Sequence, residues 1–279
     1  MGKMQLKFEI ITPMFMHGAR PRDEAELRAS SIKGLMRYWW RAVMDLPIEV
    51  LRKRETEVFG GTNPDAVKSP FILYVPPLSS THLVKPLPHR DDRNFKLRAI
   101  PSGKEFSVTI RAQNKNVTLL AVNVLKLASL LGGFGQRARR GFGSIQYRTF
   151  KSKEEFISEC SEILRYFNVR FTVQKNSIEI HRSKNARYPY LKQVLIGSPV
   201  NSAMELLEKI GKESHRNNTP LLGDVKPRYA SPVWVNVKKI GNKYYPILVM
   251  VNAAPPTSIK NNASQIDGQK FKRFIENLA

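Results

Sequence analysis

The sequence contains little cysteine and no long apolar stretch. Cys160 is the only cysteine among the 279 residues, so a single chain cannot form a disulfide or a cysteine-based zinc site. No run approaches the length of a membrane-spanning helix, which needs about 18 consecutive apolar residues. The first residues alternate in polarity, whereas a secretion signal would be continuously apolar. We therefore expect a cytoplasmic protein that makes no membrane contact.

Acidic residues are also scarce, because 46 Lys and Arg stand against 23 Asp and Glu, which gives a net charge of +23. The imbalance is clustered: segment 99–148 contains a single acid, Glu105, and segment 226–265 contains none. A polyanion would neutralise this charge, and nucleic acid is the leading class of partner for such a chain. The alternative is a basic surface without a specific partner.

The first half of the chain shows the periodicities of alternating strands and helices. Leu6, Phe8 and Ile10 alternate with polar residues, which is typical of a half-buried strand. Ser30 or Ser31 is a suitable N-cap for a helix through residue 43. The further expected elements are a strand at 71–75, a long loop at 76–98, a strand at 106–110, a helix at 119–131 capped by Thr118, and a strand at 144–150. This β-α-β-β-α-β order is the ferredoxin-like arrangement, which is also that of the RNA-recognition motif (RRM).

The second half repeats this pattern less clearly. The expected elements are a linking helix at 152–167, a strand at 188–195, a helix from Ser198 and Pro199 through Ile210, a hairpin of 233–239 and 244–251 around Gly241-Asn242, and a last helix at 271–278. No final strand is clear, so the module is either incomplete or completed by 169–173 or 178–181. The sequence predicts an α+β protein with tandem ferredoxin-like, RRM-like βαββαβ domains at 1–151 and 152–279.

A glycine-rich segment, residues 132–143, is the most informative part of the chain. It combines five glycines, among them Gly133 and Gly135, with Arg137, Arg139 and Arg140. Glycines allow close approach of a backbone, so successive N–H groups can form an anion-binding nest, and each guanidinium can grip a phosphate. We predict that this segment binds RNA phosphates, against the alternative of a flexible connection between a helix and a strand.

Aromatic residues in the same segment offer contacts to bases. Phe134 or Phe142 is placed to stack on a base. The aromatic RNP sequences of an RRM are absent, so we expect basic loops rather than the sheet face to bind RNA. The spacing Gly133-x-Gly135-x-x-Ala138 matches a dinucleotide-binding fingerprint, but it follows a helix instead of a strand, so we reject that interpretation.

Lys33, Arg37 and Arg41 recur every four residues and so share one face of the first predicted helix. This face suits a phosphate backbone, although an ordinary solvated helix face has the same pattern. Trp39 and Trp40 point about 100° apart on a helix, so we expect one in the core and the other exposed.

Signals for catalysis and metal binding are weak. The histidines lack HxxxH spacing and the chain has no Walker A sequence, so we predict no metal, no cofactor and no catalytic residue. Asp23, Glu24 or Glu26 could hold Mg²⁺ near a scissile phosphate. His17 with a neighbouring Lys or Arg could support metal-independent cleavage through the 2′-OH.

Several stretches together resemble the RAMP superfamily of CRISPR-associated proteins, and within it the first-subunit family of the type III-B Cmr effector complex. The stretches are Ile11–Gly18, Glu26–Ala42, Gly132–Gly143, Val58–Thr62 and, more loosely, Arg228–Pro232. The resemblance implies tandem ferredoxin-like domains and a glycine-rich loop that contacts RNA. It also implies assembly with other Cmr subunits on a CRISPR guide RNA, near the guide's 3′ end, in antiviral defence. RNA slicing in this family is the task of a different subunit.

We therefore predict a non-catalytic RNA-binding subunit whose partners are guide RNA, single-stranded target RNA and other Cmr subunits. The residues expected in one basic cleft are Lys33, Arg37, Arg41, Gly133, Gly135, Arg137, Arg139, Arg140, Phe142 and His17. Two alternatives remain open: a ribonuclease that uses Asp23 or His17, and a basic ribosome-associated or RNA-packing protein.

Overall fold

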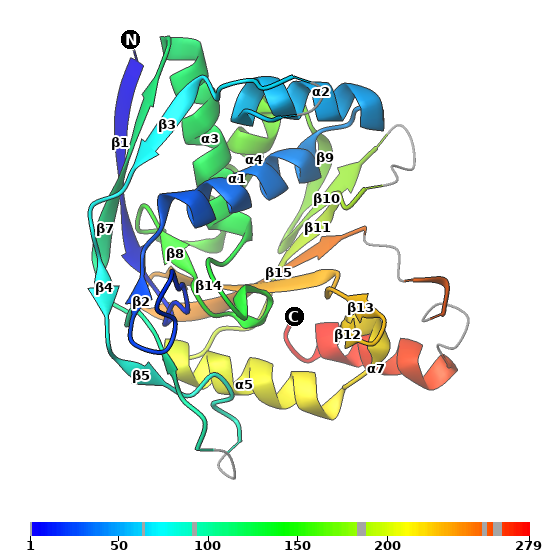
Figure 1. The fold of residues 1–279 in the computed structure, drawn as a ribbon. Coiled ribbons are helices and arrows are strands. Elements are labelled where there is room, and N and C mark those ends of the chain that lie inside the picture. The colour runs from blue at the N-terminus through cyan, green and yellow to red at the C-terminus, as the bar shows by residue number, and fades with distance from the viewer. Residues whose placement is uncertain (1, 63–64, 91–93, 183–187, 253–255, 259–263) are drawn as a thin grey trace.

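Two antiparallel sheets and the helices packed on them form an α+β structure, described here from a computed structural model (Figure 1). The structure describes residues 2–62, 65–90, 94–182, 188–252, 256–258 and 264–279.

The first sheet contains four strands in the order β3–β7–β1–β8, and every neighbouring pair is antiparallel. The strands are β1 (Gly2–Ile10), β3 (Phe71–Tyr74), β7 (Glu105–Ala112) and β8 (Ile145–Gln146). Phe8 lies opposite Phe106, and their rings stack at 5.4 Å between centroids. The main elements follow one another as β1-α1-β3-β7-α3-β8, which is the predicted βαββαβ order, although β8 pairs over two residues only.

Three helices accompany this sheet: α1 (Ala29–Val43), α2 (Ile48–Phe59) and α3 (Lys115–Leu131). The predicted caps of two of them are wrong. Arg28 stands at the N-cap of α1 without a side-chain hydrogen bond, so the serines lie inside the helix. Asn114 caps α3 by accepting from the Val117 N–H, and Thr118 instead donates to the Asn114 carbonyl. Two suitable capping residues a few positions apart compete, and local sequence does not decide between them.

Both Trp39 and Trp40 are buried, at 0% and 3% exposure, so the expectation that one is exposed is wrong. The reason is α2, which the sequence did not predict. Phe59 of α2 covers Trp40, with ring centroids 5.9 Å apart, while Trp39 meets Trp234 from the second half of the chain at 5.3 Å. The helix α1 is therefore enclosed on two sides.

Short strands lie between the main elements. They are β2 (Ala25–Glu26), β4 (Ser79–Ser80), β5 (Leu83–Val84) and β6 (Leu97–Arg98), with β2 paired to β4 and β5 paired to β6. Of these, β4, β5 and β6 fall within the expected loop 76–98.

The second sheet has the order β14–β15–β11–β10–β9 and is antiparallel throughout. Its strands are β9 (Arg170–Gln174), β10 (Ser177–His181), β11 (Leu191–Ile196), β14 (Val233–Ile240) and β15 (Lys243–Val251). The predicted hairpin is confirmed, because Gly241 takes a positive φ of 57° between β14 and β15. The position beside β11, where a final strand of the module would pair, is occupied by β10.

The helices of the second half are α4 (Lys153–Tyr166), α5 (Ala203–Arg216) and α7 (Gln265–Glu276). The predicted linking helix corresponds to α4, whereas α5 begins after its cap Ser202 and not at Ser198. The remaining short elements are η1 (Ala138–Arg140), η2 (Pro220–Leu222), β12 (Asp224–Val225) and β13 (Arg228–Tyr229).

The strand β14 lies between two layers of helices (Figure 1). Successive side chains of a strand point to opposite faces. Val235 and Val237 accordingly join the core shared with α5 and α7, while Trp234 joins the larger core that includes α1 and α3. A strand that is buried on both faces appears in the sequence as a continuous run of apolar residues. A polar residue fits within such a strand only if it has hydrogen-bond partners inside the protein.

Two polar residues of β14 close the C-terminal end of α3. The Asn236 side-chain amide donates to the carbonyls of Leu130 and Gly132, at 3.1 and 2.7 Å. The fully buried Lys238 donates to the carbonyls of Ser129 and Ile145, at 2.5 and 2.6 Å. The last carbonyls of a helix lack intrahelical partners and carry partial negative charge, so donors from β14 stabilise this end.

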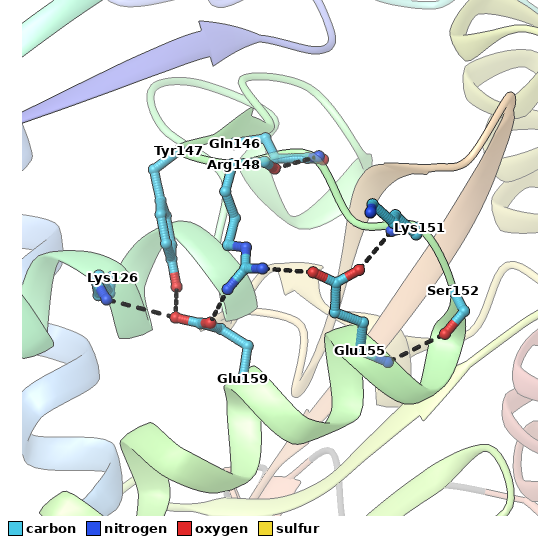
Figure 2. A network of polar contacts seen from close by, with 8 residues as sticks. All are labelled: Lys126, Gln146, Tyr147, Arg148, Lys151, Ser152, Glu155 and Glu159. Carbon is cyan, nitrogen blue, oxygen red and sulfur yellow. Dashed lines mark hydrogen bonds and ion pairs between the residues drawn. The ribbon is translucent and has the colours of Figure 1, made fainter.

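Glu159 of α4 makes a second link between the halves (Figure 2). Its carboxylate accepts from the Tyr147 hydroxyl at 2.5 Å and pairs with Arg148 at 2.7 Å and with Lys126 at 3.4 Å. Arg148 also pairs with Glu155 one turn earlier on α4. Burial by itself raises the pKa of Glu159, but the Tyr147 hydrogen bond and the two cations lower it by more, so this pKa lies below its usual value.

Candidate nucleic-acid interface

Glycines in the 132–143 loop fit it tightly against the segment that follows β1. The Gln136 N–H donates to the Phe15 carbonyl at 2.8 Å, and the Gly143 N–H donates to the Pro13 carbonyl at 2.9 Å. Gly135 has a φ of 91°, and a Cβ there would lie 2.4 Å from the Phe15 oxygen. A Cβ on Gly133 would likewise lie 2.5 Å from the oxygen of Phe142. The glycines thus allow the loop backbone to approach other backbone segments of the same protein. The N–H groups of Gln136 and Gly143 donate to carbonyls there and are not available to an anion.

The phenylalanines of the loop point into the protein. Phe134 is 1% exposed and Phe142 is 2% exposed, and the Phe142 ring packs 4.9 Å from that of Phe15. Base stacking needs an accessible ring face. The prediction that Phe134 or Phe142 stacks on a base is therefore wrong in this structure.

Arg140 joins the loop to the second half of the chain. Its guanidinium donates to the Leu222 carbonyl at 3.0 Å and to the Val233 carbonyl and Ser231 hydroxyl at 3.3 Å each, and it lies over the Phe274 ring. Burial, with smaller effects of the neighbouring arginines, lowers its pKa to about 10. Most of its donors have internal acceptors, so its main contribution is structural.

Arg139 lies over an aromatic cluster. Its guanidinium carbon is 4.4 Å from the centroid of Trp234, whose indole N–H donates to the Tyr38 hydroxyl at 3.3 Å. The buried Arg139 Nε has no hydrogen-bond partner among the described residues. The cation–π contact holds this guanidinium in place while leaving donors for a ligand, which is a suitable arrangement for gripping a phosphate.

Arg137 begins the short helix η1 in the left-handed conformation, with a φ of 58°. Its side chain lines a cavity together with His89 and His215, and no acid of the described chain pairs with it. A non-glycine residue at positive φ costs free energy and is often found at functional sites. The two histidines were not predicted, since 126 positions separate them and no local spacing links them.

The two predicted groups of cations have different partners in the structure. Arg37 and Arg41 of α1 pair with Glu55 of α2 at 3.5 and 3.6 Å, and Arg37 also donates to the Gly60 carbonyl. Lys33 lies over the Phe71 ring and donates to its carbonyl. The three loop arginines, in contrast, face the second half of the chain. RNA contact by Lys33, Arg37 and Arg41 stays a prediction. In the structure each of these side chains has a partner within the protein.

His17 and Asp23 do not form a recognisable catalytic pair. The His17 Nε2 lies 2.9 Å from the Arg98 carbonyl, and its Nδ1 is buried without a partner among the described residues. Asp23 is exposed in a turn closed by the Arg20 carbonyl. Within the described part of the chain, no three His, Cys, Asp or Glu side chains come together as possible metal ligands.

Comparison with known proteins places this arrangement in a family. The profile of the RAMP superfamily matches residues 7–146, half of the chain, including α1 and the whole arginine-bearing loop. The chain belongs to the RAMP superfamily. The partners of Arg139 and Arg140 in this RAMP protein, Trp234 and Val233 among them, lie beyond the matched region.

Relatives of this RAMP protein share its architecture over nearly the whole chain. Cmr subunit Cmr1-2 of Pyrococcus furiosus is 28% identical over 176 residues, which cover 51% of this chain and 94% of the relative. The crystal structure of Pyrococcus furiosus Cmr1 in its apo form matches with a TM-score of 0.69 at 21% identity, covering 100% of this chain and 97% of that one. A chain of type III-B Cmr-beta bound to cognate target RNA matches with a TM-score of 0.61 at 13% identity, covering 99% of each chain. No helix among the described residues of the RAMP protein is long and apolar enough to cross a membrane.

Proposed function

We propose that this RAMP protein is a Cmr1-type, non-catalytic subunit of a type III-B Cmr complex that binds guide or target RNA near the guide's 3′ end. The similarity to Cmr1 over nearly the full length supports the assignment to such a complex. In the same proposal, the chain comprises two ferredoxin-like domains, 1–151 and 152–279, with β10 in the place of the second module's last strand.

One observation carries the RNA-binding part of the proposal. Arg137 and Arg139 stand on a loop held by internal hydrogen bonds, and neither has an anionic partner among the described residues. Of the other predicted cations, Arg37 and Arg41 pair with Glu55, so they are less available. Fixed cations without partners attract a polyanion at little conformational cost.

The test is equilibrium binding of a labelled single-stranded RNA to wild type and Arg139→Gln over a range of salt concentrations. Losing one phosphate contact should weaken binding and flatten the dependence of log K on log salt by about 0.7. Arg111→Gln on the exposed side of β7 removes the same charge far from the loop and serves as the control. Equal affinity and slope for wild type and Arg139→Gln would refute an RNA contact by Arg139, and the same result for the Arg137→Gln, Arg139→Gln double variant would refute RNA binding by this loop.

Catalysis is tested in the same experiment by incubating RNA with the protein and Mg²⁺. The non-catalytic proposal expects intact RNA. Cleavage products that disappear in Asp23→Ala or His17→Ala would instead establish the ribonuclease alternative.

A further inference from the structure

A cavity of about 220 Å³ lies between the segment Pro86–His89, the arginine-bearing loop and α5. Its polar lining comes from all three and from the residue Asn218 after α5: the members are His89, Arg137, Arg140, Ser214, His215 and Asn218. No described residue of the lining is an acid. The cavity is separate from the surface that Arg139 forms with Trp234.

Several donors of this cavity have no partner within the described chain. The Nδ1 of His89 and the hydroxyl of Ser214 are buried without a hydrogen bond. Arg137 donates to no described carbonyl or carboxylate, whereas Arg140 uses its donors on the Leu222 and Val233 carbonyls. Buried polar groups almost always have partners, so a cluster of unpaired donors is the signature of a site for an acceptor-rich ligand.

The charge in the cavity selects an anion. The rings of His89 and His215 lie 6.0 Å apart, at 40° to each other. Burial lowers the pKa of His89, and the charges of His215, Arg137, Arg90 and Lys212 lower it further. Those charges are all positive, so a bound anion would relieve their mutual repulsion and favour the protonated imidazole.

The size of the cavity narrows the choice of anion. Pockets for drug-sized molecules measure about 300–1,000 Å³, so 220 Å³ suits a phosphate with part of its sugar better than an entire nucleotide. Phe142 of the lining offers no face to a base, because its ring is buried against Phe15.

A glycine of α5 makes room for the histidine. A Cβ on Gly211 would lie 2.2 Å from the Nδ1 of His89 and 3.0 Å from its Cε1. Glycine in the middle of a helix is unfavourable relative to alanine. Its presence at this position is explained by the close approach of the His89 ring.

We propose that this cavity binds one phosphate group, with Arg137, His89 and His215 as its ligands and Ser214 as a further donor. The assignment of that phosphate to RNA rests on the RNA-binding function proposed above. The group belongs either to the terminus of a strand or to an internal phosphodiester, and the two share the same recognition chemistry.

Gly211→Ala is the sharpest test, because it displaces His89 from the cavity while favouring the helix. Gly268→Ala in α7 is the matched control, since a Cβ there meets nothing within 4 Å. Arg137→Gln is the second variant and removes the fixed cation. The probes are inorganic phosphate, measured by calorimetry, and a labelled oligouridine with either a 3′-phosphate or a 3′-hydroxyl, measured by anisotropy.

Both Gly211→Ala and Arg137→Gln should weaken phosphate and oligouridine binding about tenfold, as expected for loss of a hydrogen bond to a charged group, while Gly268→Ala binds like the wild type. Tighter binding of the 3′-phosphate form would assign the site to a strand terminus, and equal binding to an internal phosphodiester. Full affinity of both variants for phosphate and RNA, with RNA still bound by the wild type, would overturn the cavity proposal alone. In another outcome the wild type binds phosphate but no RNA, and the two variants lose phosphate binding. That outcome would refute the proposed function and retain the phosphate site.

Discussion

Replacing Lys238 by methionine should change how the stability of this protein depends on pH. Burial lowers the pKa of Lys238 from 10.5 to about 7, with a small opposing effect of Cys160. The unfolded chain therefore keeps the proton up to about pH 10.5, while the folded chain releases it near pH 7. Raising the pH through this window stabilises the folded state, and below about pH 7 both states are protonated, so the penalty is constant.

The magnitude follows from the width of the window. Each pH unit in which only the unfolded chain holds the proton is worth about 1.4 kcal/mol. From about pH 7.5 to about pH 9 the wild type should therefore gain about 2 kcal/mol in unfolding free energy from this one lysine. Lys238→Met lacks the titrating group and should lose that part of the slope, while all other groups contribute equally to both proteins.

Urea denaturation followed by tryptophan fluorescence measures the difference. Trp39, Trp40 and Trp234 are all buried, so unfolding exposes each of them. The quantity compared is the difference in unfolding free energy between the two proteins at the two pH values. Parallel pH profiles would refute the reasoning, since they would mean that Lys238 titrates alike in the folded and unfolded chains.

Two further stability predictions concern the contacts between the halves. Arg140→Met should lower the unfolding free energy by about 2 kcal/mol, because it leaves the buried Leu222 carbonyl without its donor, whereas the Val233 carbonyl keeps the Ser231 hydroxyl. Urea denaturation checks this, and a change within about 0.5 kcal/mol would contradict the anchoring role. Glu159→Gln should lower the thermal midpoint at neutral pH. The pKa of Glu159 is lower in the folded chain than its unfolded value of 4.5, so the ionised carboxylate stabilises the folded state above that pH. This stabilisation is lost as the pH falls through the pKa of the folded state. The difference in midpoint between wild type and Glu159→Gln should therefore shrink on acidification below about pH 4.5, and a constant difference would show that the ion pairs of Glu159 contribute nothing.

Local signals accounted for much of the fold. Gly241-Asn242 specified its hairpin because the turn needs a positive φ, which Gly241 adopts readily. The helix α2 escaped prediction because only Leu51 and Phe59 of its twelve residues are buried, which is too few for a clear apolar stripe. The sequence left open whether 169–173 or 178–181 forms the strand beside β11. Both segments are strands in the structure, because β10 pairs with β11 and β9 pairs with β10.

The candidate site was less accessible to sequence reasoning, because burial is decided by partners distant in the chain. Phe142 looked available for stacking until Phe15 was found against it. Arg139 and Arg140 are adjacent in sequence, yet Arg140 meets the Leu222 carbonyl whereas Arg139 meets the Trp234 ring. No spacing rule joins His89 to His215, because a loop and a helix bring them together only in the folded chain.

The capping of α3 by β14 also has a consequence for synthesis on the ribosome. Asn236 and Lys238 emerge about 100 residues after the helix end that they complete, which at about 5–20 residues per second is a delay of about 5–20 s. During that interval the carbonyls of Leu130 and Gly132 lack the donor from β14. The nascent first half therefore lacks this cap until β14 of the second half has been made, and a message cut short before β14 would yield a chain that chaperones and proteases treat as unfinished.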